Sequence, residues 1–131
     1  MAILSVLAAA LASYVFGSVW YMTLANPWMK AAEIEVDDAG RPSNSGDPIP
    51  YIGAFVCAVL VAGMMRHVFA LSGIDTWHAG LTSGIGIGLF LAAPWIVTNY
   101  SFAGRNRMLM VIDGGYATFG CGIMGLVLTL F

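Results

Sequence analysis

The chain has 131 residues, of which 60% are hydrophobic and only 9% are charged, and its formal net charge is −2. A soluble domain carries about 25% charged residues, because its surface must face water. The composition therefore excludes an ordinary soluble domain. With five Lys and Arg residues in total and no basic stripe, it also excludes nucleic acid as a partner.

The first apolar segment covers about residues 1–25 and contains no charged side chain. A helix that crosses the hydrocarbon core needs about 20 apolar residues, so this segment predicts a transmembrane helix. No Lys or Arg precedes it and it continues past Ala10-Leu11-Ala12, so we expect an uncleaved span rather than a signal peptide. The polar loop 26–50 follows with most of the charges, and residues 28–38 within it are expected to form a short interfacial helix.

Three further apolar segments, at about residues 51–71, 77–100 and 108–131, predict three more spans. The loops between them are too short to cross a bilayer, so successive spans must alternate in direction. In lipid, a span must satisfy its own backbone hydrogen bonds, which requires helices. The sequence therefore predicts a single transmembrane domain over residues 1–131, an all-α integral membrane protein with four transmembrane helices in an antiparallel bundle.

The basic residues predict the orientation of this bundle, because Lys and Arg in short loops favour the cytoplasmic side. The first and third loops carry Lys30, Arg41, Arg105 and Arg107, whereas the opposite side has Arg66 alone. We therefore expect a multi-pass protein of the bacterial inner (cytoplasmic) membrane, with both termini outside the cytoplasm and the polar loop 26–50 inside.

Small residues at helical spacing predict where the spans touch, since helix association in lipid depends on close packing. The glycines on such spacing are Gly80, Gly84 and Gly88 on the third span and Gly115 and Gly122 on the fourth. Ala54, Ala58 and Ala62 repeat this spacing on the second span. These faces predict helix packing with a partner either within the chain or on another subunit. Pro94 is expected to kink the third span by freeing the carbonyl of Phe90.

Asp113 is the clearest candidate for function, because ionisable side chains inside membrane spans are costly. It lies about one and a half turns inside the fourth span, with no charged neighbour three or four residues away. The residues that could converge with it at similar depth are Trp20, Tyr21, Asn99, Tyr100, Arg105 and Tyr116. Two interpretations stay open. The cluster is either a proton-linked, cation-linked or headgroup-binding site, or a hydrogen-bond network that ties the third loop to the end of the first span.

Motifs of catalysis and metal binding are missing from the sequence. No nucleophile-and-base pattern occurs, and Gly84-Ile85-Gly86-Ile87-Gly88 lies inside an apolar span rather than between a strand and a helix, so it is no phosphate loop. His67 and His78 lack the clustered ligands of a metal site. Cys57 and Cys121 lie in apolar runs, where we expect them to pack in the core. We therefore expect no catalytic residue, no metal and no cofactor.

Two stretches of the chain resemble a known family. Gly17-Ser18-Val19-Trp20-Tyr21, followed by Pro27-Trp28-Met29, is similar to the end of the first span in small bacterial membrane proteins of domain-of-unknown-function family 1761. Thr98-Asn99-Tyr100-Ser101-Phe102-Ala103-Gly104-Arg105, with Ile112-Asp113-Gly114-Gly115-Tyr116, resembles the family pattern at the third loop and fourth span. The resemblance implies four spans and supplies no activity. The family usually has Asn where this chain has Asp113, and the added negative charge suggests a pairing with Arg105. The family also often has His where this chain has Ala117.

Three functions are compatible with these features. The first is an accessory or structural subunit that packs within a larger membrane complex, such as an energy-transducing one, or associates with itself. The second is a small oligomeric transporter or channel for an ion or small solute, which would need a polar path through the bilayer centre. The third is an enzyme acting on lipids or quinones, with Asp113 and Tyr116 as acid–base groups. The sequence favours the first, with the lipid bilayer and other membrane subunits or further copies as partners.

Overall fold

The computed structural model describes residues 2–36, 38–40, 42 and 46–131. Met1 of the first predicted span, Asp37 of the predicted interfacial helix, and Arg41, one of the residues used to predict the orientation, lie outside the described residues. Within the described part, the chain is helical except for its connections and an isolated bridge between Val36 and Pro42.

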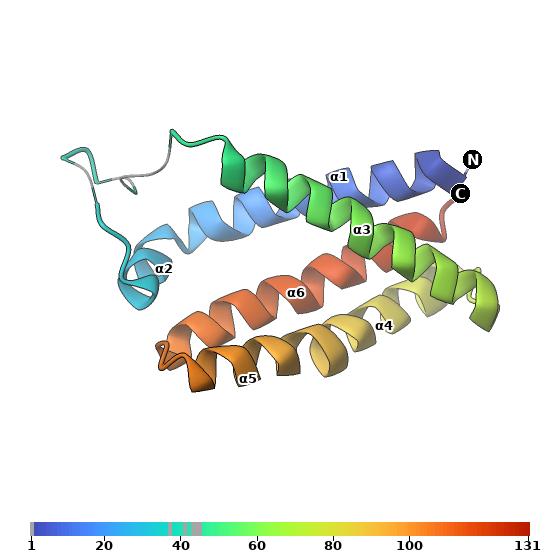
Figure 1. The fold of residues 1–131 in the computed structure, drawn as a ribbon. Coiled ribbons are helices and arrows are strands. Elements are labelled where there is room, and N and C mark those ends of the chain that lie inside the picture. The colour runs from blue at the N-terminus through green and yellow to red at the C-terminus, as the bar shows by residue number, and fades with distance from the viewer. Residues whose placement is uncertain (1, 37, 41, 43–45) are drawn as a thin grey trace.

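The elements in chain order are α1 (Ala2–Thr23), α2 (Ala25–Ala32), α3 (Ile49–Ser72), α4 (Trp77–Ile87), the π-helical turn η1 (Gly88–Ala92), α5 (Ala93–Phe102) and α6 (Arg107–Leu128). α4, η1 and α5 form one continuous helix, and this helix, α1, α3 and α6 are each long and apolar enough to cross a membrane. They run in alternating directions, with both termini at one end of the bundle and α2 at the other (Figure 1). The prediction of an all-α multi-pass membrane protein with four antiparallel spans is confirmed.

Local sequence explains where the later spans begin and end. α3 begins at Ile49 with Pro50 in its first turn. Proline is tolerated there because the backbone N–H groups of the first turn have no partner within the helix. The helix ends at Gly73, which adopts the left-handed conformation with a φ of 70°. α6 begins after Asn106, whose side-chain oxygen accepts a hydrogen bond from the Met108 backbone N–H at 2.8 Å. This cap satisfies one of the donors that every helix start leaves open.

The short helix α2 lies earlier in the chain than residues 28–38, where the sequence suggested it. It follows α1 almost directly and ends at Glu33, which has a φ of 56°. Its Ala31 and Ala32 are buried with Leu109 of α6, and the ring of Trp28 packs against the same cluster. The apolar side of α2 thus covers the beginning of α6, and this fixes the helix at one end of the bundle, here called the α2 end.

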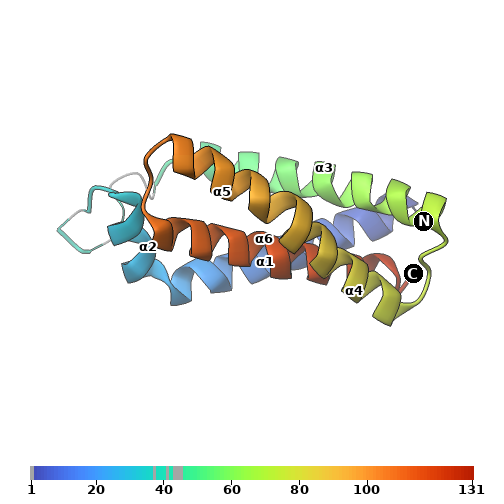
Figure 2. The ribbon, with the colours of Figure 1, turned by 90° about the horizontal axis from the view of Figure 1, so that it is seen from below.

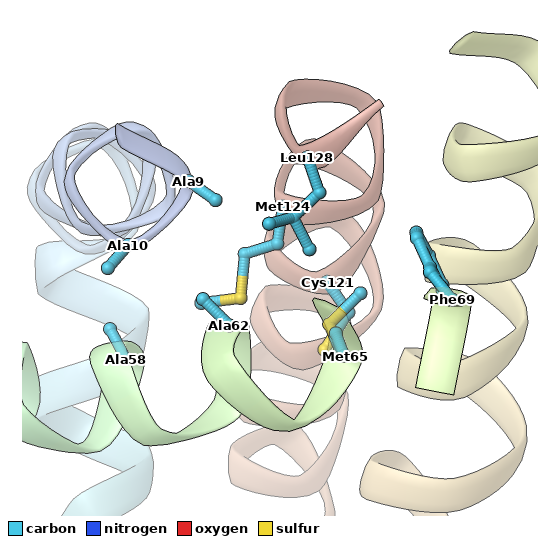
Figure 3. Close-up of a cluster of buried hydrophobic side chains, with 9 residues drawn as sticks. All are labelled: Ala9, Ala10, Ala58, Ala62, Met65, Phe69, Cys121, Met124 and Leu128. Atoms are coloured by element: carbon cyan, nitrogen blue, oxygen red, sulfur yellow. The ribbon is translucent and has the colours of Figure 1, made fainter. Parts of the chain in front are cut away.

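α6 is the central helix. In the 18-residue stretch of highest hydropathy in each span, 50% of the residues are buried in α6. The corresponding shares are 28% in α1, 22% in α3 and 17% in the α4–η1–α5 helix. α1 and α4 pack along α6, whereas α3 crosses over α1 and α6 (Figures 1 and 2). The buried side chains at this crossing are Ala9, Ala10, Ala58, Ala62, Met65, Phe69, Cys121, Met124 and Leu128 (Figure 3). The alanines let α3 approach α1 closely, as small residues do in lipid.

The packing of α4 on α6 depends on glycine. Gly80, Gly84 and Gly88 all face α6: a Cβ at Gly84 would meet the backbone carbonyl oxygen of Cys121, and a Cβ at Gly88 would lie 2.5 Å from that of Ala117. Real Cβ atoms do not approach backbone this closely. The partner of this glycine face is therefore within the chain.

The two glycines singled out on α6 also lie at helix contacts. A Cβ at Gly122 would lie 2.8 Å from Cγ1 of Ile85 on α4, and one at Gly115 would lie 2.8 Å from Cζ2 of Trp20 on α1. α6 therefore receives side chains of its neighbours at both positions.

Pro94 leaves the third span continuous. It lies in the first turn of α5, directly after the π-helical turn η1. Because proline has no backbone N–H, one turn of the ladder must rearrange, and the sequence predicted a kink for this reason. The structure accommodates Pro94 through the wider π-helical turn, a feature often found near functional sites.

Candidate functional site

Asp113 accepts two hydrogen bonds from tyrosines of two other helices. The Tyr21 hydroxyl of α1 donates to Oδ1 at 2.5 Å, and the Tyr100 hydroxyl of α5 donates to Oδ2 at 2.6 Å. All three side chains are half-buried. Both carboxylate oxygens are therefore partnered, which offsets the cost of holding this group inside a span. These three residues are called the Asp113 network below.

Trp20 and Tyr116 extend this network, Trp20 through a hydrogen bond and Tyr116 through a ring contact. The indole N–H of Trp20 donates to the carbonyl oxygen of Ile112 at 3.0 Å, which ties α1 to α6 beside Asp113. The ring of Tyr116 stands edge-on to Tyr21, with centroids 5.3 Å apart. Tyr116 also fits against Gly17, where a Cβ would lie 2.7 Å from its Cε1 atom. The structure thus brings together Trp20, Tyr21, Tyr100, Asp113 and Tyr116.

Arg105 borders this group without bonding to Asp113, since its backbone N–H donates to the carbonyl oxygen of Tyr100 at 2.9 Å. The guanidinium of Arg105 donates to the carbonyl oxygen of Ala32 at 2.8 Å, so it holds the end of α2. Among the described residues, no ion pair joins it to Asp113, in contrast to the suggested pairing. Asn99 is exposed on α5.

The hydrogen bonds of the Asp113 network tie three helices together. Each carboxylate oxygen accepts one hydrogen bond from a phenol hydroxyl. The three residues come from α1, α5 and α6, and their bonds close the α2 end of the bundle across three helices. Hydrogen bonds to a charged acceptor contribute about 1.5–3 kcal/mol each, enough to fix the relative position of these helices.

A second feature, a groove of about 510 Å³, lies between α3 and the α4–η1–α5 helix with α6 as its floor. It is open on one side and almost wholly apolar. Its lining consists of Ser13, Ala54, Cys57, Ala58, Val61, Met64, Met65, Val68, Ile87, Leu91, Ala92, Tyr116, Ala117, Gly120, Cys121 and Met124. Because Tyr116 both lines the groove and contacts Tyr21, the groove adjoins the Asp113 network.

Sequence reasoning did not find this groove. Ala54 was assigned to a packing stripe with Ala58 and Ala62, yet it is exposed and lines the groove, while the other two are buried. Cys121 is buried as expected, whereas Cys57 is exposed, so its predicted core position is wrong. The sequence predicted only a kink at Pro94 in this part of the third span, and no groove followed from that prediction.

Comparison with known proteins identifies a family over almost the whole chain. Residues 4–129 match the family described as "Protein of unknown function (DUF1761)". Neither the search of curated proteins nor the search of solved structures gave a match.

Proposed function

This chain belongs to domain-of-unknown-function family 1761, whose description assigns no activity, and we propose that it is a non-catalytic accessory subunit that packs laterally against a larger membrane protein. The family membership was expected from the motifs around Trp20 and Asp113. The proposal concerns which surface makes the contact and what that contact requires.

The observation that carries the proposal is an outward face of α4 with small side chains, in addition to the glycine face that contacts α6. Gly80, Gly84 and Gly88 face α6, so residues about half a turn away point outward. There, a Cβ at Gly86 would meet nothing within 4 Å, and Thr82 is exposed with its hydroxyl donating to its own helix at 2.7 Å. Small and weakly polar residues are enriched where membrane helices pack on one another. This outer face of α4 therefore suits a helix of another protein.

The distribution of polar groups supports packing over a solute pathway. The Asp113 network lies at the α2 end, where each carboxylate oxygen accepts a hydrogen bond from a tyrosine. The groove that runs along α3 is apolar. A solute path would need polar groups through the middle of the bilayer, so neither feature favours transport.

We expect Gly86→Leu to abolish co-purification with a partner, because the added side chain holds a neighbouring helix away from α4. Gly53→Leu on α3 is the matched control, since a Cβ there also meets nothing within 4 Å. The measurement is native mass spectrometry after mild purification from the native membrane at native expression. A stoichiometric complex for wild type and Gly53→Leu, absent for Gly86→Leu, supports the proposal. A monomer or pure homo-oligomer for wild type, or a complex that survives Gly86→Leu, contradicts it.

We also propose the bacterial inner membrane, with the α2 end in the cytoplasm. Lys30, Arg105 and Arg107 gather at that end, and Arg66 lies toward the other, in line with the preference of basic loops for the cytoplasm. A periplasm-active alkaline phosphatase fused after Phe131 is expected to be active. A fusion that is inactive there, but active when inserted near Gly46, would reverse the orientation.

A further inference from the structure

A second pocket, of about 290 Å³, lies at the end of the bundle that carries both termini, here called the terminal end (Figure 1). It is bounded by the start of α1, the last turns of α3 and α6, and the connection between α3 and α4. Its polar lining residues are Ser5, Arg66, Asp75 and Thr129. A water molecule occupies about 30 Å³, so this pocket, the terminal pocket, admits a group of several heavy atoms.

Arg66 places a cation in the terminal pocket at the edge of the hydrocarbon core. It precedes Ser72, the last residue of α3, by six residues, which is about 9 Å. The 24 residues of α3 extend over about 36 Å, against about 30 Å of hydrocarbon, so Arg66 lies just within the span. Its side chain is half-buried, and among the described residues no ion pair or hydrogen bond involves its guanidinium. Lipid phosphates, which border the hydrocarbon, are the anions within its reach.

Asp75 places an anion in the same pocket, farther from the hydrocarbon core. It belongs to the connection that follows α3, so it lies beyond Arg66 along the axis of the bundle. The two side chains carry opposite charges and line one pocket, yet no ion pair joins them in the part of the chain that the structure describes. Opposite charges at different depths of one pocket suit a ligand that itself carries both charges.

The hydroxyl groups of the terminal pocket present acceptors rather than donors. Ser5 and Thr129 each donate their hydroxyl hydrogen to a backbone carbonyl oxygen of the preceding turn at 2.9 Å. Because a hydroxyl has a single hydrogen, the oxygen that faces the pocket is left to accept. Among the lining residues, Arg66 therefore supplies the side-chain donors, and Asp75, Ser5 and Thr129 supply the acceptors. This division fits one anionic and one cationic group of a ligand.

We propose that the terminal pocket binds the zwitterionic headgroup of phosphatidylethanolamine from the leaflet at the terminal end, with the phosphate at Arg66 and the ammonium at Asp75. In this lipid the phosphate adjoins the glycerol and the ammonium lies farther out, which is the order of Arg66 and Asp75 along the bundle. A guanidinium pairs with phosphate through two parallel hydrogen bonds. A primary ammonium donates several hydrogen bonds to carboxylate and hydroxyl oxygens.

Two other phospholipids match the terminal pocket less well. Phosphatidylglycerol carries the same phosphate but no cation, so Asp75 loses its partner and repels the added negative charge. Phosphatidylcholine carries a cation whose nitrogen has no hydrogen, so it cannot donate to Asp75, Ser5 or Thr129. Selectivity among these three headgroups therefore reports on Asp75, whereas binding of the phosphate reports on Arg66.

Native mass spectrometry of the purified protein, titrated with each of these three lipids in turn, tests the assignment. The lipids carry identical acyl chains, so only the headgroup differs. We expect one bound phosphatidylethanolamine, with an apparent affinity about fivefold above that of phosphatidylglycerol, the ratio that corresponds to one exposed ion pair. Equal binding of the three lipids, or a preference for phosphatidylglycerol, would overturn the assignment.

Two charge-removing variants assign the two halves of the headgroup. We expect Arg66→Gln to lose the lipid adduct, and Arg107→Gln to retain it, because Arg107 is exposed and outside the pocket. We expect Asp75→Asn to keep a lipid adduct but to bind phosphatidylethanolamine and phosphatidylglycerol equally. A loss of fold would not produce this change of preference. An unchanged preference in Asp75→Asn, or equal loss of the adduct in Arg66→Gln and Arg107→Gln, contradicts the proposal.

The source of the headgroup and its independence from the packing surface are tested in the same experiment. Glycerophosphoethanolamine has the same charged groups without acyl chains, and we expect it not to displace the bound lipid. Displacement would mean that the pocket takes a soluble zwitterion, and the lipid assignment would be wrong. Gly86 does not line the terminal pocket, so Gly86→Leu is expected to keep the lipid while it loses the partner protein. Loss of both together would make the lipid part of the protein contact and contradict a separate site.

Discussion

Replacing Gly84 by leucine is expected to lower the free energy of unfolding by about 3 kcal/mol or more, at the upper end of what overpacking costs. A Cβ at Gly84 would overlap the carbonyl oxygen of Cys121 and lie 3.0 Å from the Cα of Gly122. These are backbone atoms of the central helix, so they cannot turn aside as a flexible side chain would. α4 must therefore move away from α6 along the contact that Gly80 and Gly88 share.

The measurement is reversible unfolding by sodium dodecyl sulfate in mixed micelles, followed by circular dichroism. Gly86→Leu is the matched control, because it adds the same side chain to the same helix two residues on, where a Cβ meets nothing. We expect Gly86→Leu to unfold within about 0.5 kcal/mol of the wild type, as exposed substitutions usually do. Leucine has a higher helix propensity than glycine, so equal destabilisation of the two variants would mean that the close contact of Gly84 with α6 does not decide the result.

The four spans could be predicted because each is specified locally. An uncharged apolar segment long enough to cross a bilayer has one stable conformation there, a helix, and the short joining loops force alternation. The helix ends also follow from local chemistry, as Asn106 and Gly73 show. Even Gly84 could be identified from spacing alone. Only its partner needed the structure, because spacing does not distinguish α6 from a second subunit.

The Asp113 network could be predicted in part. The position of each residue along its span placed Tyr21, Tyr100 and Asp113 at the same depth in the membrane. In a small bundle, residues at the same depth have few possible contact partners. Depth does not, however, give the direction of a side chain. Arg105 was expected to pair with Asp113, but α2 begins earlier than predicted, and its end presents the Ala32 carbonyl to the guanidinium. The position of Arg105 thus depended on an element whose limits the sequence left uncertain.

The groove could not be predicted, because it arises from the angle between helices rather than from any segment. α3 packs on α1 through Ala58 and Ala62, and it diverges from the α4–η1–α5 helix toward the α2 end (Figure 1). Hydrophobicity is the same for a side chain that faces a groove and one that faces lipid, so Cys57 and Leu60 look alike in the sequence. Only the packed structure separates them.

The double replacement Tyr21→Phe/Tyr100→Phe is expected to destabilise the bundle by about 3–6 kcal/mol, since each lost bond to a charged acceptor costs about 1.5–3 kcal/mol. Both hydroxyls donate to Asp113, so the double variant leaves a half-buried carboxylate without either partner. Asp113→Asn is expected to cost much less. Its amide has the same shape, keeps one oxygen that accepts from a tyrosine, and removes the charge that makes an unpartnered group expensive.

The decisive comparison adds Asp113→Asn to the double variant and follows unfolding by sodium dodecyl sulfate. If Tyr21 and Tyr100 act by stabilising a charge, the triple variant must be more stable than the double one, because the unpartnered carboxylate is gone. If the three substitutions acted independently, the third would lower the free energy of unfolding further. An increase on adding Asp113→Asn would therefore be specific to the loss of the charge. A double variant within about 1 kcal/mol of the wild type would instead mean that water already solvates Asp113. In that case the hydrogen bonds would not hold α1, α5 and α6 together, and Asp113 would become the first residue to examine for a role in proton or cation binding.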